Sequence, residues 1–218
     1  MSSFFVFVFL FTFFSVSVNR GTLAIVGNSS VIKTQWKEKL DEVKEEQNRI
    51  RQEIRERQQD ASEQATLKRE EFRARLEGIK DEGKKIALKR IDLNLGLINL
   101  KWVESWNNVL ERYSQILVKT ESRVEKLKES GVDVSGVESA ILEAENVIKS
   151  AQEALLAQAE KEYIVDIEDE DSLGTSVSSA VRQLRSDLQE TRDSIIQAHK
   201  ALRDVLLSLS GLDGGGDQ

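Results

Sequence analysis

The sequence contains neither cysteine nor proline, and it has few aromatic residues outside its beginning. The absence of cysteine excludes disulfides, thiolate catalysis and cysteine-based zinc sites. The absence of proline permits very long helices, because an interior proline costs about 3 kcal/mol. Seven of the eight Phe lie within the first fourteen residues, and Phe72 is the eighth. A chain so poor in large core residues favours a narrow helical bundle over a thick globular core.

Positive net charge is also lacking, since the chain carries a formal charge of -7. Nucleic-acid binders usually show a basic stripe or a high pI, and the Lys and Arg residues of 37–92 are mixed with nearly as many acids. We therefore expect no nucleic-acid partner.

Motifs for catalysis and metal binding are missing as well. His199 is the single histidine, so a zinc site of the usual kind has too few ligands. The acidic cluster at 166–171 lacks the ligand register of a calcium loop, which favours a solvated loop. HExxH, GxSxG and Walker A patterns do not occur. The sequence predicts no enzyme, no cofactor, no metal and no small-molecule ligand.

The first twenty residues are expected to be a signal peptide or a membrane anchor, with membrane association through residues 4–18. This apolar run has the length of a signal-peptide core and is short for a membrane span of about 20 residues. Ser15 and Ser17 supply the small residues that signal peptidase prefers. No Lys or Arg precedes the run, and Arg20 follows it closely. An uncleaved anchor extending to Val26, with the helices kept in the cytoplasm by the positive residues that follow, and a disordered N-terminus both remain open.

Residues 21–32 form a polar spacer, and residues 33–83 are predicted to be a charged coiled-coil helix, or arm. Its apolar stripe is thin, because Gln47 and the polar run 55–71 interrupt it. The arm either projects from the rest of the protein or packs on it. Gly78 and Gly83 weaken the helix and are the predicted joint.

Residues 84–210 are predicted to form an antiparallel three-helix bundle, so the fold class is all-α. Gly131 ends the first helix, Ser135 begins the second with a capping box or with Asp133 as an alternative cap, and the acidic segment 164–175 is a loop. The last helix has a 3.5-residue repeat, and 211–218 is a flexible tail. The core positions predicted for the first helix are Ile91, Leu95, Ile98, Trp102, Trp106, Val109, Tyr113, Ile116, Thr120, Val124 and Leu127. Those predicted for the second helix are Val137, Ile141, Ala144, Ile148, Ala151, Leu155 and Ala159. Those predicted for the last helix are Val177, Val181, Leu184, Leu188, Thr191, Ile195, Ala198, Leu202, Val205 and Leu209.

The three tryptophans are the candidate partner-binding residues. Trp36 opens the stripe of the arm, and Trp102 and Trp106 lie one turn apart on one helical face. Core packing is the favoured interpretation of this pair. A partner-binding patch is the alternative, because exposed aromatic residues concentrate at interfaces.

The segments ESRVEKLKESGVDVSGVESAILEAENVIKSAQ and RSDLQETRDSIIQAHKALRDVLLSL resemble a loosely defined group of predicted exported helical-bundle proteins from bacteria with reduced genomes. This resemblance implies no activity. The apolar leader and helical body also look superficially like periplasmic holdase chaperones of the Skp type, whose basic body and small β-sheet are not visible here. We therefore expect a non-enzymatic, envelope-associated helical scaffold or spacer that binds a protein partner or itself, with a holdase chaperone as the alternative.

Overall fold

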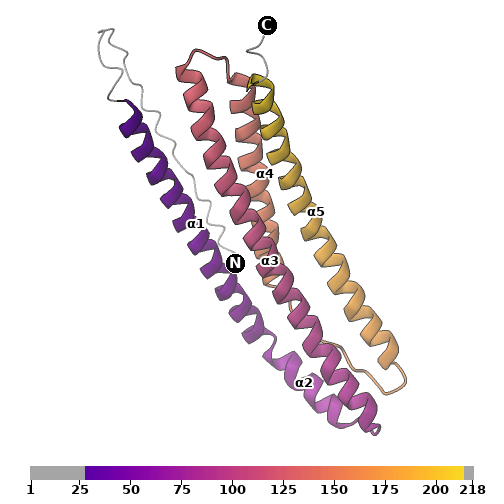
Figure 1. Ribbon diagram of the computed structural model, residues 1–218. Helices are drawn as coiled ribbons and strands as arrows, with labels where there is room; N and C mark the ends of the chain where they lie inside the picture. Colours follow the sequence, from indigo (N-terminus) through magenta and orange to yellow (C-terminus); the bar gives the residue numbers. More distant parts are fainter. Residues whose placement is uncertain (1–27, 214–218) are drawn as a thin grey trace, which may run out of the picture.

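The computed structural model describes residues 28–213, and side chains within residues 34–212. The fold is all-α, as predicted, and five helices pack against one another (Figure 1). The apolar N-terminal segment, spacer residues 21–27 and tail residues 214–218 lie outside the described residues. Between residues 28 and 213, no helix has the length and apolar character that crossing a membrane requires. The helices are α1 (Asn28–Gln64), α2 (Thr66–Glu77), α3 (Glu82–Glu129), α4 (Ser135–Ala159) and α5 (Leu173–Asp213).

The chain reverses its direction between α2 and α3, between α3 and α4, and between α4 and α5 (Figure 1). Side-chain contacts follow this order. Lys39 of α1 pairs with Glu121 of α3, and Arg51, further along α1, pairs with Glu111, nearer the start of α3. α1 and α3 are therefore antiparallel, while α3 and α5 run in the same direction with α4 opposed to both.

The apolar core has two parts. An upper cluster joins α3, α4 and α5 with Ile50 and Ile54 of α1. A lower cluster joins α2, the start of α3, the start of α5 and the connection between α4 and α5. Leu188 contacts both clusters. The predicted stripe of α4 is buried at every position, namely Val137, Ile141, Ala144, Ile148, Ala151, Leu155 and Ala159.

The predicted core face of α3 is partly wrong. Ile98, Trp102 and Ile116 are exposed. Buried instead are apolar residues on a face rotated from the predicted one, together with polar residues such as Asp92 and Asn99. The helix is apolar on more than one side over residues 93–103, so periodicity alone could not decide which side faces α4.

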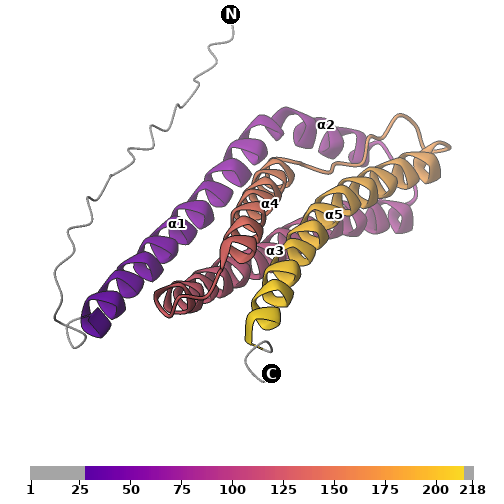
Figure 2. The ribbon, with the colours of Figure 1, turned by 90° about the horizontal axis from the view of Figure 1, so that it is seen from above.

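The charged arm packs along the bundle and does not project from it. Seen from above, α1 lies beside α4, on the side away from α5 (Figure 2). The arm is also not one helix. The helix is interrupted at the buried Ala65, and α2 continues at an angle to α1 (Figure 1). α1 begins at Asn28, inside the predicted spacer, where short polar residues favour a helix start. Of the two residues of the predicted joint, Gly78 follows the last residue of α2, whereas Gly83 lies in the first turn of α3.

Gln47 does not interrupt the buried stripe of α1 but belongs to it. Its side chain is 3% exposed and faces α3. Its Nε2 donates a long hydrogen bond of 3.4 Å to Ser114 Oγ, and its Oε1 has no hydrogen-bond partner among the described residues. A buried acceptor without a donor costs about 1–3 kcal/mol. The attachment of α1 therefore has a weak point at its centre.

The turns between the helices show why each helix ends where it does. Gly131 has a φ of 82°, which is the left-handed conformation predicted for the residue after α3. The capping box at Ser135 is not formed; the carboxylate of Asp133 accepts a hydrogen bond from Ser135 N instead. Gly174 was expected in the loop but lies in the first turn of α5. Gly211 does not end α5, which continues to Asp213.

Replacing Ile195 of α5 with Asp should destabilise the protein strongly, because the side chain is buried in the upper cluster. Losing an apolar contact and burying a carboxylate together should cost roughly 3–5 kcal/mol. Leu207→Asp, on an exposed side of the same helix, is the control and should cost less than about 0.5 kcal/mol. Urea unfolding followed by circular dichroism measures both, and equal stability of the two variants would refute this core assignment.

Replacing Gln47 with Leu should stabilise the attachment of α1 by about 1–2 kcal/mol, because it removes the unpaired Oε1. Hydrogen exchange resolved by segment should then slow over residues 40–60. Gln52→Leu, at an exposed position of α1, is the matched control. If exchange over 40–60 became faster in Gln47→Leu, Gln47 would be a satisfied anchor of α1 and not its weak point.

Candidate functional site

A groove runs between α3 and α5. Its volume is about 360 Å³. The buried side chains of Leu95, Trp106 and Leu184 form the floor, and Ile98 and Trp102 form the exposed wall on α3. The wall on α5 is mixed, since apolar residues alternate with Arg185, Gln189 and Arg192. Apolar groups open to solvent beside charged groups are typical of surfaces that bind other molecules.

The predicted tryptophan pair lies in this groove. The rings of Trp102 and Trp106 are 5.0 Å apart between centroids and inclined by 34°. Trp106 is 6% exposed and packs in the upper cluster, while Trp102 is 45% exposed and rests on it. The core-packing prediction therefore holds for Trp106 and fails for Trp102.

The structure does not bring Trp36 to the groove. Trp36 is half-buried near the start of α1, and Lys39 Nζ lies 5.6 Å from the centroid of its ring. This distance allows a cation–π interaction. Lys39 also forms an ion pair with Glu121 of α3, and this pair helps to hold the N-terminal part of α1 on the bundle.

Arg185 and Arg192 are the charged residues of the groove, and sequence reasoning did not single them out. Neither forms an ion pair with any residue between 34 and 212, although Arg192 Nη1 lies 3.5 Å from Gln189 Oε1. Most other arginines of the chain could not be distinguished from them in the sequence. Only the packing shows which ones border an apolar surface and which ones already face an acid.

A second group of polar residues is buried directly behind the groove. Gln158, at the end of α4, donates through Nε2 to Asn99 Oδ1 and to Tyr163 Oη, both at 2.8 Å. The Tyr163 hydroxyl donates to Asp187 Oδ2 at 2.9 Å, and Thr191 Oγ1 donates to Gln158 Oε1 at 3.3 Å. This polar layer connects α3, α4, the following segment and α5. Along α3 and α5 this layer lies between residues of the lower cluster, such as Leu95 and Leu184, and residues of the upper cluster, such as Val103 and Ile195.

The charges within the polar layer are balanced by the chain itself. Burial works to raise the pKa of Asp187, but hydrogen bonds from Gln183, Lys161 and Tyr163 outweigh it, so the pKa lies below its usual value. Burial also raises the pKa of the Tyr163 hydroxyl. The carboxyl is therefore ionised and the phenol neutral near pH 7. The arrangement suits a structural tie, since each group is already engaged by another.

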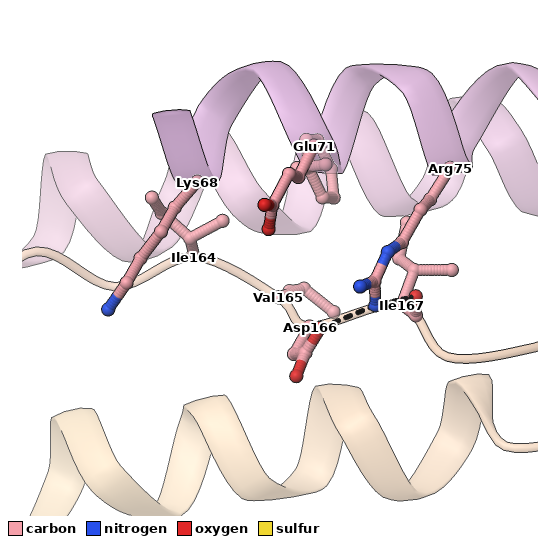
Figure 3. A pocket seen from close by; sticks show the side chains of 8 residues that line it. Lys68, Glu71, Arg75, Ile164, Val165, Asp166 and Ile167 are labelled. Carbon is pink, nitrogen blue, oxygen red and sulfur yellow. Dashed lines mark hydrogen bonds and ion pairs between the residues drawn. The ribbon is translucent and has the colours of Figure 1, made fainter. Parts of the chain in front are cut away.

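The segment after α4 is more than the predicted acidic loop. Its apolar residues Tyr163, Val165 and Ile167 are buried in the lower cluster, whereas Ile164 is half-buried and Asp166 is exposed. Figure 3 shows this segment running alongside α2, where Arg75 Nη1 donates to Asp166 Oδ1 at 2.9 Å and to Ile167 O at 2.6 Å. A hollow of about 210 Å³ remains between α2 and the segment.

Three of the five acidic residues at 166–171 have side-chain partners within the protein, namely Asp166, Asp169 and Glu170. The carboxylate of Glu170 pairs with Lys84, which lowers the pKa of Glu170. Asp169 accepts hydrogen bonds from Ser172 N and Asp171 N just before α5, and the pKa of Asp169 is also lowered. Within the described part of the chain, no three His, Cys, Asp or Glu residues are placed to hold a metal ion. These three acids therefore help to anchor the segment.

The remaining candidate, His199, is exposed on α5 with its ring 5.9 Å from that of Tyr113.

No known protein family matches this chain, and comparisons with curated proteins and with solved structures found no significant match either. The functional argument therefore rests on the surfaces described above.

Replacing Gln158 with Leu should disrupt the polar layer, because the new side chain has a similar volume but no hydrogen-bonding atoms. Asn99 Oδ1 loses its donor, and Tyr163 and Thr191 each lose a contact, so we expect a loss of about 3 kcal/mol. Gln59→Leu removes only an exposed hydrogen bond to Glu63 and should change stability by less than about 0.5 kcal/mol. Similar thermal stability of the two variants would show that the layer contributes little.

Proposed function

We propose that this protein is a non-enzymatic, envelope-associated helical scaffold or spacer that binds a protein partner, or itself, through helical faces. The observation that carries the proposal is the apolar surface of α3. Between residues 93 and 102 this helix leaves five large apolar side chains exposed, namely Leu93, Leu97, Ile98, Leu100 and Trp102. They lie on two sides of α3, because Ile98 and Trp102 border the groove with α5, whereas Leu100 lies beside Arg51 and Ile54 of α1. Exposed apolar side chains gathered on one element commonly mark a site of association.

The dimensions of the helices support a spacer. α3 is 48 residues long, which corresponds to about 72 Å at 1.5 Å per residue. The other helices pack along it, and ion pairs such as Lys39–Glu121 and Arg57–Glu160 tie α1 and the end of α4 together with it. A straight body of this length can separate two attached molecules while its surface binds one of them.

Association with the envelope is proposed from the sequence of the N-terminal segment. Residues 4–18 are apolar except for Thr12, Ser15 and Ser17, a pattern shared by signal peptides and anchors. The alternative function is a holdase chaperone, for which the exposed apolar surface of α3 would bind unfolded clients. A scaffold binds one partner at one place, whereas a holdase suppresses aggregation of unrelated clients.

A photo-crosslinking residue at Leu97 or Trp102, in the full chain expressed in its native cell, should give one discrete protein adduct. The same residue at Glu153, an exposed position of α4, is the matched control and should give none. Fractionation of these cells should place the adduct in the envelope. A smear of many adducts, with suppression of aggregation of a model client, would favour the holdase. Absence of any adduct at positions 97 and 102 would refute partner binding through α3.

A further inference from the structure

The groove between α3 and α5 has the size of a site for a helix. Along α3 it extends over the twelve residues from Leu95 to Trp106, a rise of about 16 Å. Three turns of a bound helix have this length. A helix bound in a groove inserts apolar anchors at positions i, i+3 or i+4, and i+7. The floor of Leu95, Trp106 and Leu184 offers an apolar surface for such anchors, and Trp102 stands beside it as an exposed aromatic ring.

The charge of the groove indicates which helix would fit. Arg185 and Arg192 are seven residues apart on one side of α5, a separation of about 10 Å. Neither has an acidic partner within residues 34–212. The positions of α5 that share this side at helical spacing include no Asp or Glu, although the whole chain has a net charge of -7. They are Val181, Arg185, Gln189, Arg192, Ile196, His199 and Arg203.

We infer that the α3/α5 groove binds an amphipathic helix of another protein that carries two carboxylates seven residues apart along the edge of its apolar face. The apolar residues of this helix lie on Leu95, Trp102 and Trp106. Its carboxylates face Arg185 and Arg192 and form charge-assisted hydrogen bonds with them. This inference rests on the proposed function, because it assigns that function a surface and a partner chemistry.

The chemistry of the groove also explains why the partner is a different protein. Two copies of this chain each carry a charge of -7, and such charges oppose self-association. Arg185 and Arg192 therefore form a local positive region on α5 in a protein whose net charge is negative. It attracts acidic helices, while the apolar floor selects those with an apolar face.

The test uses a displayed library of 18-residue amphipathic peptides, selected on the full chain. Enriched peptides should carry Asp or Glu seven residues apart beside an apolar face, and their binding should shift the fluorescence of Trp102 to shorter wavelength. The double variant Arg185→Glu/Arg192→Glu should bind the selected peptides at least tenfold more weakly. Peptides with Lys at the two acidic positions should bind this variant at least tenfold more tightly than they bind the natural chain.

Two further variants control for the place of binding. Trp102→Ala removes the larger of the two side chains in the exposed wall of the groove and should weaken binding at least tenfold. Arg203→Glu, on the same side of α5 but beyond the groove, should change binding less than twofold. All these positions are exposed, and circular dichroism establishes that each variant keeps the helical fold.

Several results would overturn the inference. These are selected peptides without acidic residues, binding unaffected by the arginine pair, binding only to anionic lipid vesicles, and dimerisation of the chain that Trp102→Ala abolishes. The proposed function is tested separately by crosslinking in cells. An adduct through Leu97 combined with no peptide binding in the groove would leave the function standing and refute this site. Peptide binding in the groove without any adduct in cells would leave this site standing and refute the proposed function.

Discussion

The hydrogen bonds around Gln158 allow α4 to end partway along the bundle, because they satisfy the polar groups that are buried at its end. α4 has 25 residues, whereas α3 has 48 and α5 has 41, so α4 cannot cover the full length of its neighbours. At the point where α4 ends, Asn99 Nδ2 donates to Lys161 O, and the side chain of Gln158 contacts Asn99 and Tyr163. These contacts satisfy backbone and side-chain groups that would otherwise be buried without partners.

The lower half of the molecule is built on this exit from α4. The extended segment that follows takes the place of the missing helix, and its buried residues Tyr163, Val165 and Ile167 complete the lower cluster. α2 can pack there because the segment offers it an apolar edge and the carboxylate of Asp166 for Arg75. The same polar layer also ties Asn99 of α3 to Asp187 and Thr191 of α5, through Gln158 and Tyr163, just behind the groove. The polar layer thus connects the two helices that form the walls of the groove, and this would lower the entropic cost of the binding proposed there.

The sequence predicted some of this arrangement well and some of it poorly, for identifiable reasons. α4 and the second half of α5 each have one side on which apolar residues recur at spacings of three and four without a break. The buried residues from Ile141 to Leu155 and from Ile195 to Leu209 therefore followed from periodicity. α3 has apolar residues on several sides and buries the polar Asn99, so periodicity selected a face that includes the exposed Trp102.

The other errors came from polar residues whose partners are distant in the chain. Gln47 was taken as a break in the stripe of α1, but it is buried against α3. The buried apolar residues of 163–167 were overlooked because they run into the acidic cluster at 166–171. For the groove, the tryptophans were recognisable in advance, whereas Arg185 and Arg192 were not, since only packing reveals which cations lack an acid.

The direction of the helices gives the bundle two unlike ends. α1 begins, and α5 finishes, at the end where α3 turns into α4, while α2 and the start of α5 lie at the opposite end (Figure 1). The groove is centred near residue 100 of α3, about 29 residues from Glu129, or roughly 40 Å along the helix. A tether joined to the chain before Asn28 and a ligand held beside Trp102 would therefore be kept at a stand-off of this order. The bundle would then act as a ruler, with the number of helical turns between Trp102 and Glu129 setting the gap.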